Sequence, residues 1–266
     1  TSGSNVTLVD AGAIDLGAST VSGTYAVTAT ADGDITDSGV LAITGTSTLT
    51  AADEQSIILD QSSTFGTVAF VASSGNLKNV TINDSNALDL SALTLAQVSG
   101  AGGNLTVTAG GAVTDSGTLV IPGTTTISAS GQDVTLNDSS NNFGTATITG
   151  ANVAVTDTNA IALGASTISG TYSITADGNI TDDGAQVITG LTTLGAGSGI
   201  ITLDNSSNDF QGGLVIQSSG NVVLRDVGAI DLGAATVSGT YSVTAGGAIT
   251  DSGTQEITGV TTLAAG

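Results

Sequence analysis

One segment recurs four times along the chain, and this repetition restricts the fold more than any other feature. The copies are GTYAVTATADGDITDSG at 23–39, GNLTVTAGGAVTDSG at 103–117, GTYSITADGNITDDG at 170–184 and GTYSVTAGGAITDSG at 239–253. A single active site needs one set of residues, whereas a repeat architecture needs the same unit again and again. The repetition therefore predicts that the copies build the fold itself.

Two anchor residues keep a constant separation within each unit. A phenylalanine follows the aspartate of the TDSG or TDDG motif at the same separation in three units, which gives the pairs Asp37 and Phe65, Asp115 and Phe143, and Asp182 and Phe210. The same aspartate recurs for the last time at Asp251, so that the unit length is roughly 70 residues. We divide the chain into repeat units at roughly 1–72, 73–149, 150–218 and 219–266.

The second unit is longer than the later ones, by about six residues. A further anchor, at Asp10, Asp84, Asp157 and Asp226, precedes the next TDSG or TDDG aspartate in every unit, and this separation is largest between Asp84 and Asp115. Aligning the units places the excess in LTLAQVSGAGG, from Leu93 to Gly103. We interpret this segment as a longer surface loop between strands, with a specialised binding loop as the alternative.

Short apolar segments within each unit have the pattern of β-strands. Segments such as YSVT, IITL, VVL and AIDL alternate or carry β-branched residues, and Gly, Asn, Asp or Ser ends each of them within a few residues. A unit of about 69 residues divides into three parts of about 23, close to one turn of a parallel β-helix with three short strands. We predict an all-β fold: a single continuous parallel β-solenoid over 1–266, with three turns per unit, rather than a sandwich array or a propeller.

The charge of the chain excludes several classes of partner. The 23 acidic residues face only two basic ones, Lys78 and Arg225, so the net charge is −21. A nucleic acid needs a basic face, and so does an anionic membrane surface. No apolar run reaches the roughly 20 residues of a membrane-spanning helix, so we expect no membrane insertion. Cys and His are absent, which excludes disulfides, Cys or His metal sites and imidazole chemistry.

Candidate catalytic groups lack the partners that catalysis needs. The closest carboxylate pairs, Asp182 with Asp183 and Asp32 with Asp34, have no basic neighbour in the sequence. A nucleophilic serine needs a His or Lys to take its proton, and Lys78 is the only such residue. The GAGG at 100–103 precedes a strand and lacks the helix N-terminus of a phosphate cradle. We therefore expect a protein that is not an enzyme, with no catalytic, cofactor-binding or metal-binding residues.

Calcium is the one cofactor for which the acidic bends offer suitable ligands. Carboxylate and carbonyl oxygens are the ligands that this cation prefers. The densest cluster is ADGD at 31–34, with Asp37 nearby. The regular GGxGxDxUx calcium repeat is absent, so the sequence predicts no cofactor, with calcium at these bends as the alternative.

The repeated GAIDLGAxTVSGTYSVTAGGAITDSGTxxITGTTTL, followed by IITLDNSSNDFQGG, resembles the repeat regions of filamentous haemagglutinin-like exoproteins. These are long passengers of two-partner secretion in Gram-negative bacteria. The resemblance covers essentially the whole chain and implies a right-handed β-helical shaft that folds outside the cell and serves adhesion, aggregation or matrix building. It also implies self-association, or contact with a host or neighbouring cell surface. The secretion domain of that family has no counterpart here, and the only proline is Pro122.

The sequence therefore predicts a structural shaft of an extracellular adhesin or fibre. Two other functions stay open: an ice-binding solenoid, for which TGTSTLT, PGTTTIS and TATITG supply threonine pairs, and a polysaccharide-binding or polysaccharide-cleaving β-helix. We also expect a segment of a longer chain, because the sequence opens inside a unit and stops at TTLAAG, where the preceding copy continues from TTLGAG into SGIITLDNSS.

Overall fold

The computed structural model of this chain describes residues 2–266. The chain forms two compact units, one ending at Gln132 and the other spanning Asp133–Gly266, and each is described by itself. Short β-strands make up both units, and the described residues contain no helix.

The strands follow one another at short intervals. In the first unit they are β1 (Ser2–Gly3), β2 (Val6–Asp10), β3 (Ile14–Leu16), β4 (Ser19–Val21), β5 (Tyr25–Ala29), β6 (Ile35–Asp37), β7 (Leu41–Ala51), β8 (Ile57–Ala72), β9 (Asn79–Asp84), β10 (Leu88–Leu90), β11 (Leu93–Thr94), β12 (Gln97–Val98), β13 (Ala101–Gly102), β14 (Asn104–Ala109), β15 (Val113–Asp115) and β16 (Leu119–Ser128). In the second unit they are β17 (Val134–Leu136), β18 (Asn142–Gly150), β19 (Val153–Asp157), β20 (Ile161–Leu163), β21 (Ser166–Ile168), β22 (Tyr172–Ala176), β23 (Ile180–Asp182), β24 (Gln186–Ile188), β25 (Thr192–Gly195), β26 (Ile201–Leu203), β27 (Asp209–Phe210), β28 (Gly213–Ser219), β29 (Val222–Asp226), β30 (Ile230–Val237), β31 (Tyr241–Ala245), β32 (Ile249–Asp251), β33 (Gln255–Ile257) and β34 (Thr261–Ala265).

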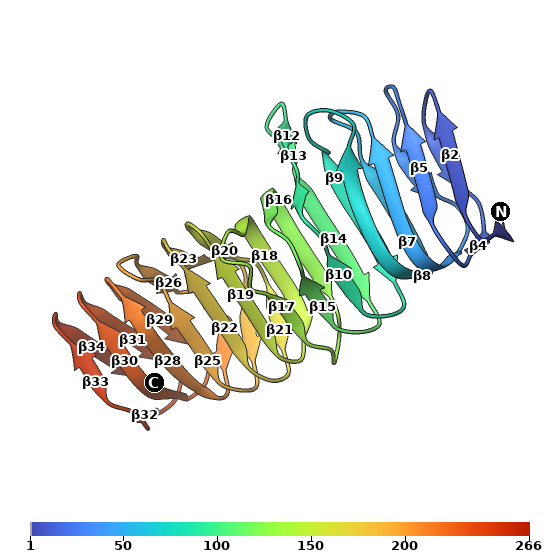
Figure 1. Ribbon diagram of the computed structural model, residues 1–266. Helices are drawn as coiled ribbons and strands as arrows, with labels where there is room; N and C mark the ends of the chain where they lie inside the picture. Colours follow the sequence, from blue (N-terminus) through green and yellow to red (C-terminus); the bar gives the residue numbers. More distant parts are fainter. Residues whose placement is uncertain (1) are drawn as a thin grey trace. The chain divides into compact units, whose positions relative to one another are not determined.

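Strands of successive turns pair in parallel, which makes each unit a β-solenoid (Figure 1). In the first unit β2 pairs with β5, and β5 pairs with β7, so Val6, Tyr25 and Ser47 stack on consecutive turns. Over both units the chain makes about 13 turns of about 21 residues. The predicted all-β parallel solenoid is confirmed.

Each turn is shorter than predicted from the sequence, and this changes how the sequence repeat maps onto the fold. In the second unit β22, β23 and β24 form three sides of one turn, because β25, β26 and β27 of the next turn pair with them in the same order. With turns of about 21 residues, one sequence repeat covers about three and a third turns instead of three. Tyr172 therefore stacks between Val153 and Thr192, whereas Tyr241, the equivalent residue of the next repeat, lies in a different column, beside Val222.

Alternate residues of each strand point into the core. In β5, Tyr25, Val27 and Ala29 are buried, while Ala26 and Thr28 are half-buried on the outer face. The strands β22 and β31 show nearly the same pattern. Because pairing between turns keeps the register, buried side chains of one turn stack on those of the next, and each fully buried aliphatic side chain contributes about 1.5–3 kcal/mol.

Glycines at one type of bend stack so closely that no side chain fits between the turns. A Cβ on Gly190 would lie 2.4 Å from the carbonyl oxygen of Gly170 in the preceding turn. A Cβ on Gly45 would lie 2.1 Å from the carbonyl oxygen of Gly23. Both distances are too short for real atoms, so these bends require glycine for close approach of the backbones.

At other bends, asparagine side chains form hydrogen bonds with the following turn. In each case the side-chain Oδ1 accepts a hydrogen bond from a backbone N–H of the next turn: Asn5 from Thr24 at 2.9 Å, Asn104 from Thr124 at 2.8 Å, Asn179 from Ile200 at 3.0 Å and Asn221 from Thr240 at 2.8 Å. We call these residues the bend asparagines. They satisfy backbone donors that the short strands leave free.

Candidate functional site

The excess segment of the second unit forms a small hairpin. Its strands β12 and β13 pair antiparallel, unlike every strand pair described above, and Figure 1 shows them standing out from the neighbouring turns. Ser99 and Gly100 connect the two strands, with φ values of 53° and 79°. Positive φ at both central residues is typical of a tight two-residue hairpin turn. The predicted surface loop is therefore an ordered hairpin.

Two residues whose types occur once in the sequence lie against this hairpin. A Cβ on Gly102 would lie 2.8 Å from Cγ of Lys78, and a Cβ on Gly103 would lie 2.9 Å from Cγ of Pro122. The side-chain Nε2 of Gln97 donates a hydrogen bond to the Pro122 carbonyl oxygen at 3.4 Å. The interruption of the repeat, the lysine and the proline are therefore one surface feature, which we call the hairpin cluster.

The hairpin cluster differs in composition from the acidic bends around it. Ser99, Gly100 and Ala101 are exposed at its tip, and Lys78 is half-buried at its base. None of the residues from Gln97 to Gly103 is a carboxylate. Segments that project from a rigid scaffold commonly carry binding residues. The hairpin cluster is therefore the part of the described chain that differs most from its repeated surroundings.

The GAGG at 100–103 belongs to this hairpin. Gly100, Gly102 and Gly103 have φ values of 79°, 88° and 71°, and the segment leads into the strand β14. The sequence predicted this position correctly, because no helix follows the glycines.

A second set of residues with unusual chemistry is a series of buried aspartates at equivalent positions of three repeats. Asp84, Asp157 and Asp226 are only 1–2% exposed. Both carboxylate oxygens of Asp157 accept backbone N–H groups, Oδ2 from Phe143 at 2.6 Å and Oδ1 from Asn159 at 2.7 Å. Sequence reasoning treated these aspartates only as markers of the repeat, so it missed their role.

Asp226 repeats the arrangement in the last repeat. Its Oδ2 accepts the N–H of Phe210 and its Oδ1 accepts the N–H of Gly228, both at 2.6 Å. Phe210 lies in the preceding repeat unit, so the carboxylate ties two segments that the sequence separates. The backbone N–H of the anchor phenylalanine and the carboxylate of the anchor aspartate therefore form one contact.

The surroundings of these carboxyl groups shift their ionisation. Burial raises the pKa of Asp226 above its ordinary value, the N–H donors of Phe210 and Gly228 oppose that rise, and the negative charge of Asp209 adds to it. Burial likewise raises the pKa of Asp157, with Asp177 as the neighbouring charge. These acceptors are thus carboxyl groups that the fold buries at a cost in solvation.

The carboxylate pairs considered as catalytic candidates accept hydrogen bonds at bends. Asp182 accepts the backbone N–H groups of Asp204 and Asn205 at 3.1 and 3.2 Å, whereas Asp183 beside it is exposed. In the other pair, Asp34 accepts the Ser56 N–H at 2.7 Å. These contacts give Asp182 and Asp34 the role of bend acceptors.

The acidic residues around ADGD at 31–34 accept hydrogen bonds from different backbone groups. Asp37 is buried and accepts the N–H of Asp60 at 2.9 Å, whereas Asp34 accepts that of Ser56. Among residues 2–266 no group of three or more acidic side chains is placed to hold a metal ion.

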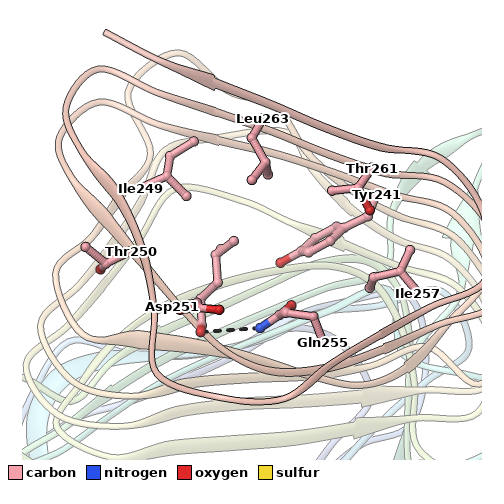
Figure 2. Close-up of a pocket in the computed structure, with 9 residues that line it drawn as sticks. Tyr241, Ile249, Thr250, Asp251, Gln255, Ile257, Thr261 and Leu263 are labelled. Atoms are coloured by element: carbon pink, nitrogen blue, oxygen red, sulfur yellow. Dashed lines mark hydrogen bonds between the residues drawn. The ribbon is translucent and has the colours of Figure 1, made fainter.

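A hollow of about 440 Å³ lies in the last turn of the second unit (Figure 2). The ring of Tyr241 points into it, and Gln255 Nε2 donates to the carbonyl oxygen of Leu232 at 3.5 Å, which is the dashed line in the figure. Tyr241 and Leu232 occupy core positions of the repeat and are buried. The hollow is therefore an opening of the core, and polar side chains such as Thr250, Asp251 and Gln255 also line it.

Threonines stack on the outer face in short runs. One run covers three turns, with Thr81, Thr106 and Thr126 in register. In TGTSTLT, by contrast, Thr48 lies between Ala26 and Ala69 on the neighbouring turns. A continuous ice-binding plane would need threonine pairs in register on every turn, and these stacks do not provide them.

Within the described part of the chain, no helix is long and apolar enough to cross a membrane.

Comparison with known proteins places the chain in a repeat family. A family model described as "Repeats of unknown function (DUF5649)" matches it four times, over residues 3–72, 77–149, 150–217 and 219–266. No curated protein and no solved structure matches the chain. Because the four matches together cover nearly the whole sequence, this β-solenoid belongs to the DUF5649 repeat family.

Proposed function

We propose that this chain is a non-enzymatic structural shaft of an extracellular bacterial adhesin or fibre. The observation that carries the proposal is the regular stacking of turns, from which the hairpin of β12 and β13 projects at one place in the described residues. An enzyme concentrates reactive side chains in a cleft, whereas a shaft repeats the same contacts along its length. The resemblance of the repeats to filamentous haemagglutinin-like exoproteins supports the same role.

The contacts between turns suit a part that must keep its shape. Backbone pairing, the bend asparagines and the buried aspartates all link a turn to its neighbour. In a solenoid such contacts recur at every turn, so stability grows with the number of turns. A shaft of this kind holds an adhesive part away from the cell surface.

The partners in this proposal are other copies of the chain or a host or neighbouring cell surface. The net charge of −21 makes lateral contact between copies unfavourable, since like charges repel. We propose that divalent cations bridge acidic faces when fibres or a matrix form. Bundling of purified chains should then weaken on addition of a chelator, whereas bundling that ignores both chelator and salt contradicts the bridging.

The test of the shaft uses the bacterium that makes this protein. Antibody should label the chain on intact cells, and deletion of its gene should reduce adhesion or aggregation. Removing residues 172–191, one turn by the pairing of Tyr172 with Thr192, should leave adhesion largely intact, because a shaft loses only one step of about 4.8 Å. Unchanged adhesion and aggregation in the deletion strain would overturn the proposal.

A separate assay addresses catalysis. Purified chain is incubated with extracellular polysaccharides, and the formation of new reducing ends is measured. We expect none above a heat-denatured control. Turnover that disappears in an Asp182→Asn variant would replace the shaft by a polysaccharide-cleaving function.

A further inference from the structure

Among the seven N-x-S/T triplets of the chain are four whose asparagine Oδ1 accepts a backbone N–H of the next turn. They are Asn5 in NVT, Asn79 in NVT, Asn104 in NLT and Asn179 in NIT. A triplet of this kind, with x other than proline, is the acceptor sequence for an N-linked sugar. The triplet alone is a weak signal in a chain rich in serine and threonine, so the geometry of each asparagine decides whether it suits modification.

The bend geometry uses one end of the asparagine side chain and leaves the other free. In Asn5, Asn104 and Asn179 the Oδ1 atom accepts a backbone N–H of the next turn at 2.8–3.0 Å. Within residues 2–266 the Nδ2 atom of these three side chains has no hydrogen-bond partner. A sugar on Nδ2 therefore leaves the bond that fastens the bend intact.

The second recognition group lies on the outer face of the same strand. In NLT, Leu105 is buried and Thr106 is half-buried on the outside, because alternate strand residues point in opposite directions. In NIT, Ile180 is buried and Thr181 lies outside in the same way. The asparagine amide and the threonine hydroxyl of each triplet are thus both on the surface of the solenoid.

The fold does not require the hydroxyl. Asn221 forms the same bend contact, with its Oδ1 accepting the Thr240 N–H at 2.8 Å, yet the residue two positions later is Val223. The bend asparagine and the threonine are therefore separable, and Asn221 is a natural control with the same bend contact and no triplet.

The triplets at Asn79 and Asn104 lie so close together that a sugar on one would crowd a sugar on the other. Asn79 and Asn104 are in register on adjacent turns, which lie only about 4.8 Å apart. The Nδ2 of Asn79 also lies 3.5 Å from Oγ of Ser56, at the limit of a hydrogen bond. Asn104 is consequently the better acceptor of this pair.

We propose that Asn104 and Asn179 are N-glycosylation sites of this protein. A glycosyltransferase moves a sugar from an activated donor, a nucleotide-diphosphate sugar or a lipid-pyrophosphate sugar, to Nδ2. The bond between sugar C1 and the phosphate oxygen breaks, a C1–N bond forms, the diphosphate leaves, and the amide nitrogen gives up one proton to a base of the transferase. The modification adds to the shaft role and does not depend on adhesion.

The test is mass spectrometry of the chain purified from the bacterium that makes it. Lys and Arg together number only two, so the chain is cut at its aspartates, and fragmentation that preserves the glycosidic bond locates any sugar. Peptides with Asn104 or Asn179 should carry a sugar, and Asn221 should carry none. Native protein without sugar at both Asn104 and Asn179 overturns the proposal.

Two variants expressed in the same bacterium show whether the triplet is what the transferase reads. Thr106→Val should remove the sugar from Asn104 and leave the circular dichroism spectrum unchanged, because the bond from Asn104 to Thr124 remains. Val223→Thr should add a sugar at Asn221. A sugar that persists on Asn104 in Thr106→Val, or an Asn221 that stays bare in Val223→Thr, contradicts the proposal.

Discussion

Replacing Asp226 by alanine tests whether the buried carboxylates hold segments of successive turns together. In the wild type both oxygens accept backbone N–H groups at 2.6 Å, from Phe210 and Gly228, and the side chain is 2% exposed. Alanine leaves two buried donors without partners, and each such loss costs about 1–3 kcal/mol. We therefore expect a local destabilisation of about 3 kcal/mol, which is roughly a hundredfold in an equilibrium constant.

The assay is amide hydrogen exchange, because a solenoid can open locally without unfolding as a whole. The amides of Phe210 and Gly228 should exchange about a hundred times faster in Asp226→Ala than in the wild type, while the amide of Val134, three turns before the turn that contains Phe210, should keep its rate. Asp177→Ala is the matched control, since it removes an exposed carboxylate with the same charge. Unchanged exchange at Phe210 in Asp226→Ala would refute the reasoning.

Three further perturbations test other parts of the structure. Gly190→Ala should cost about 1–3 kcal/mol of unfolding free energy in chemical denaturation, because its Cβ would meet backbone 2.4 Å away, whereas Gly17→Ala, with no atom within 4 Å, should be nearly neutral. Deleting residues 172–191 should preserve the β-sheet circular dichroism spectrum, and deleting half of that turn should abolish it, since only a whole turn keeps every strand in its column. Burial raises the pKa of Asp226 above 3.8, so its contribution to stability is fully present below pH 3.8 and is lost as pH rises through the folded pKa. Asp226→Asn should therefore lose less stability than the wild type between about pH 4 and pH 7, as measured by chemical denaturation at both pH values.

The sequence alone determined the class of fold. Alternation of apolar and polar residues in segments such as YSVT predicted short half-buried strands, and in β22, which is YSITA, Tyr172 and Ile174 lie inside and Ser173 outside. Local alternation is a property of a few consecutive residues, so it needs no knowledge of the rest of the chain. The excess from Leu93 to Gly103 was also visible in the sequence, because the other repeats show how long the unit normally is.

The length of a turn was open to error because it depends on how each bend closes. Pairing joins Val153 to Tyr172 across one turn and Thr192 to Leu214 across another, and the second of these turns is the longer. The repeated motif gives no sign of such differences. Only the register between turns shows that one sequence repeat advances by about a third of a turn beyond three, so that Tyr241 faces a different side from Tyr172.

The contacts that join distant segments were decided by the tertiary structure. Nothing in the order of residues shows that Asp226 accepts the N–H of Phe210, or that Lys78 and Pro122 lie against the hairpin formed by β12 and β13. Each contact depends on which residues meet one turn later. The length of a turn depends on several bends, and backbone contacts with the preceding turn shape each bend. The repeat in the sequence therefore specifies where the strands form, whereas the stacking of turns specifies which strands become neighbours.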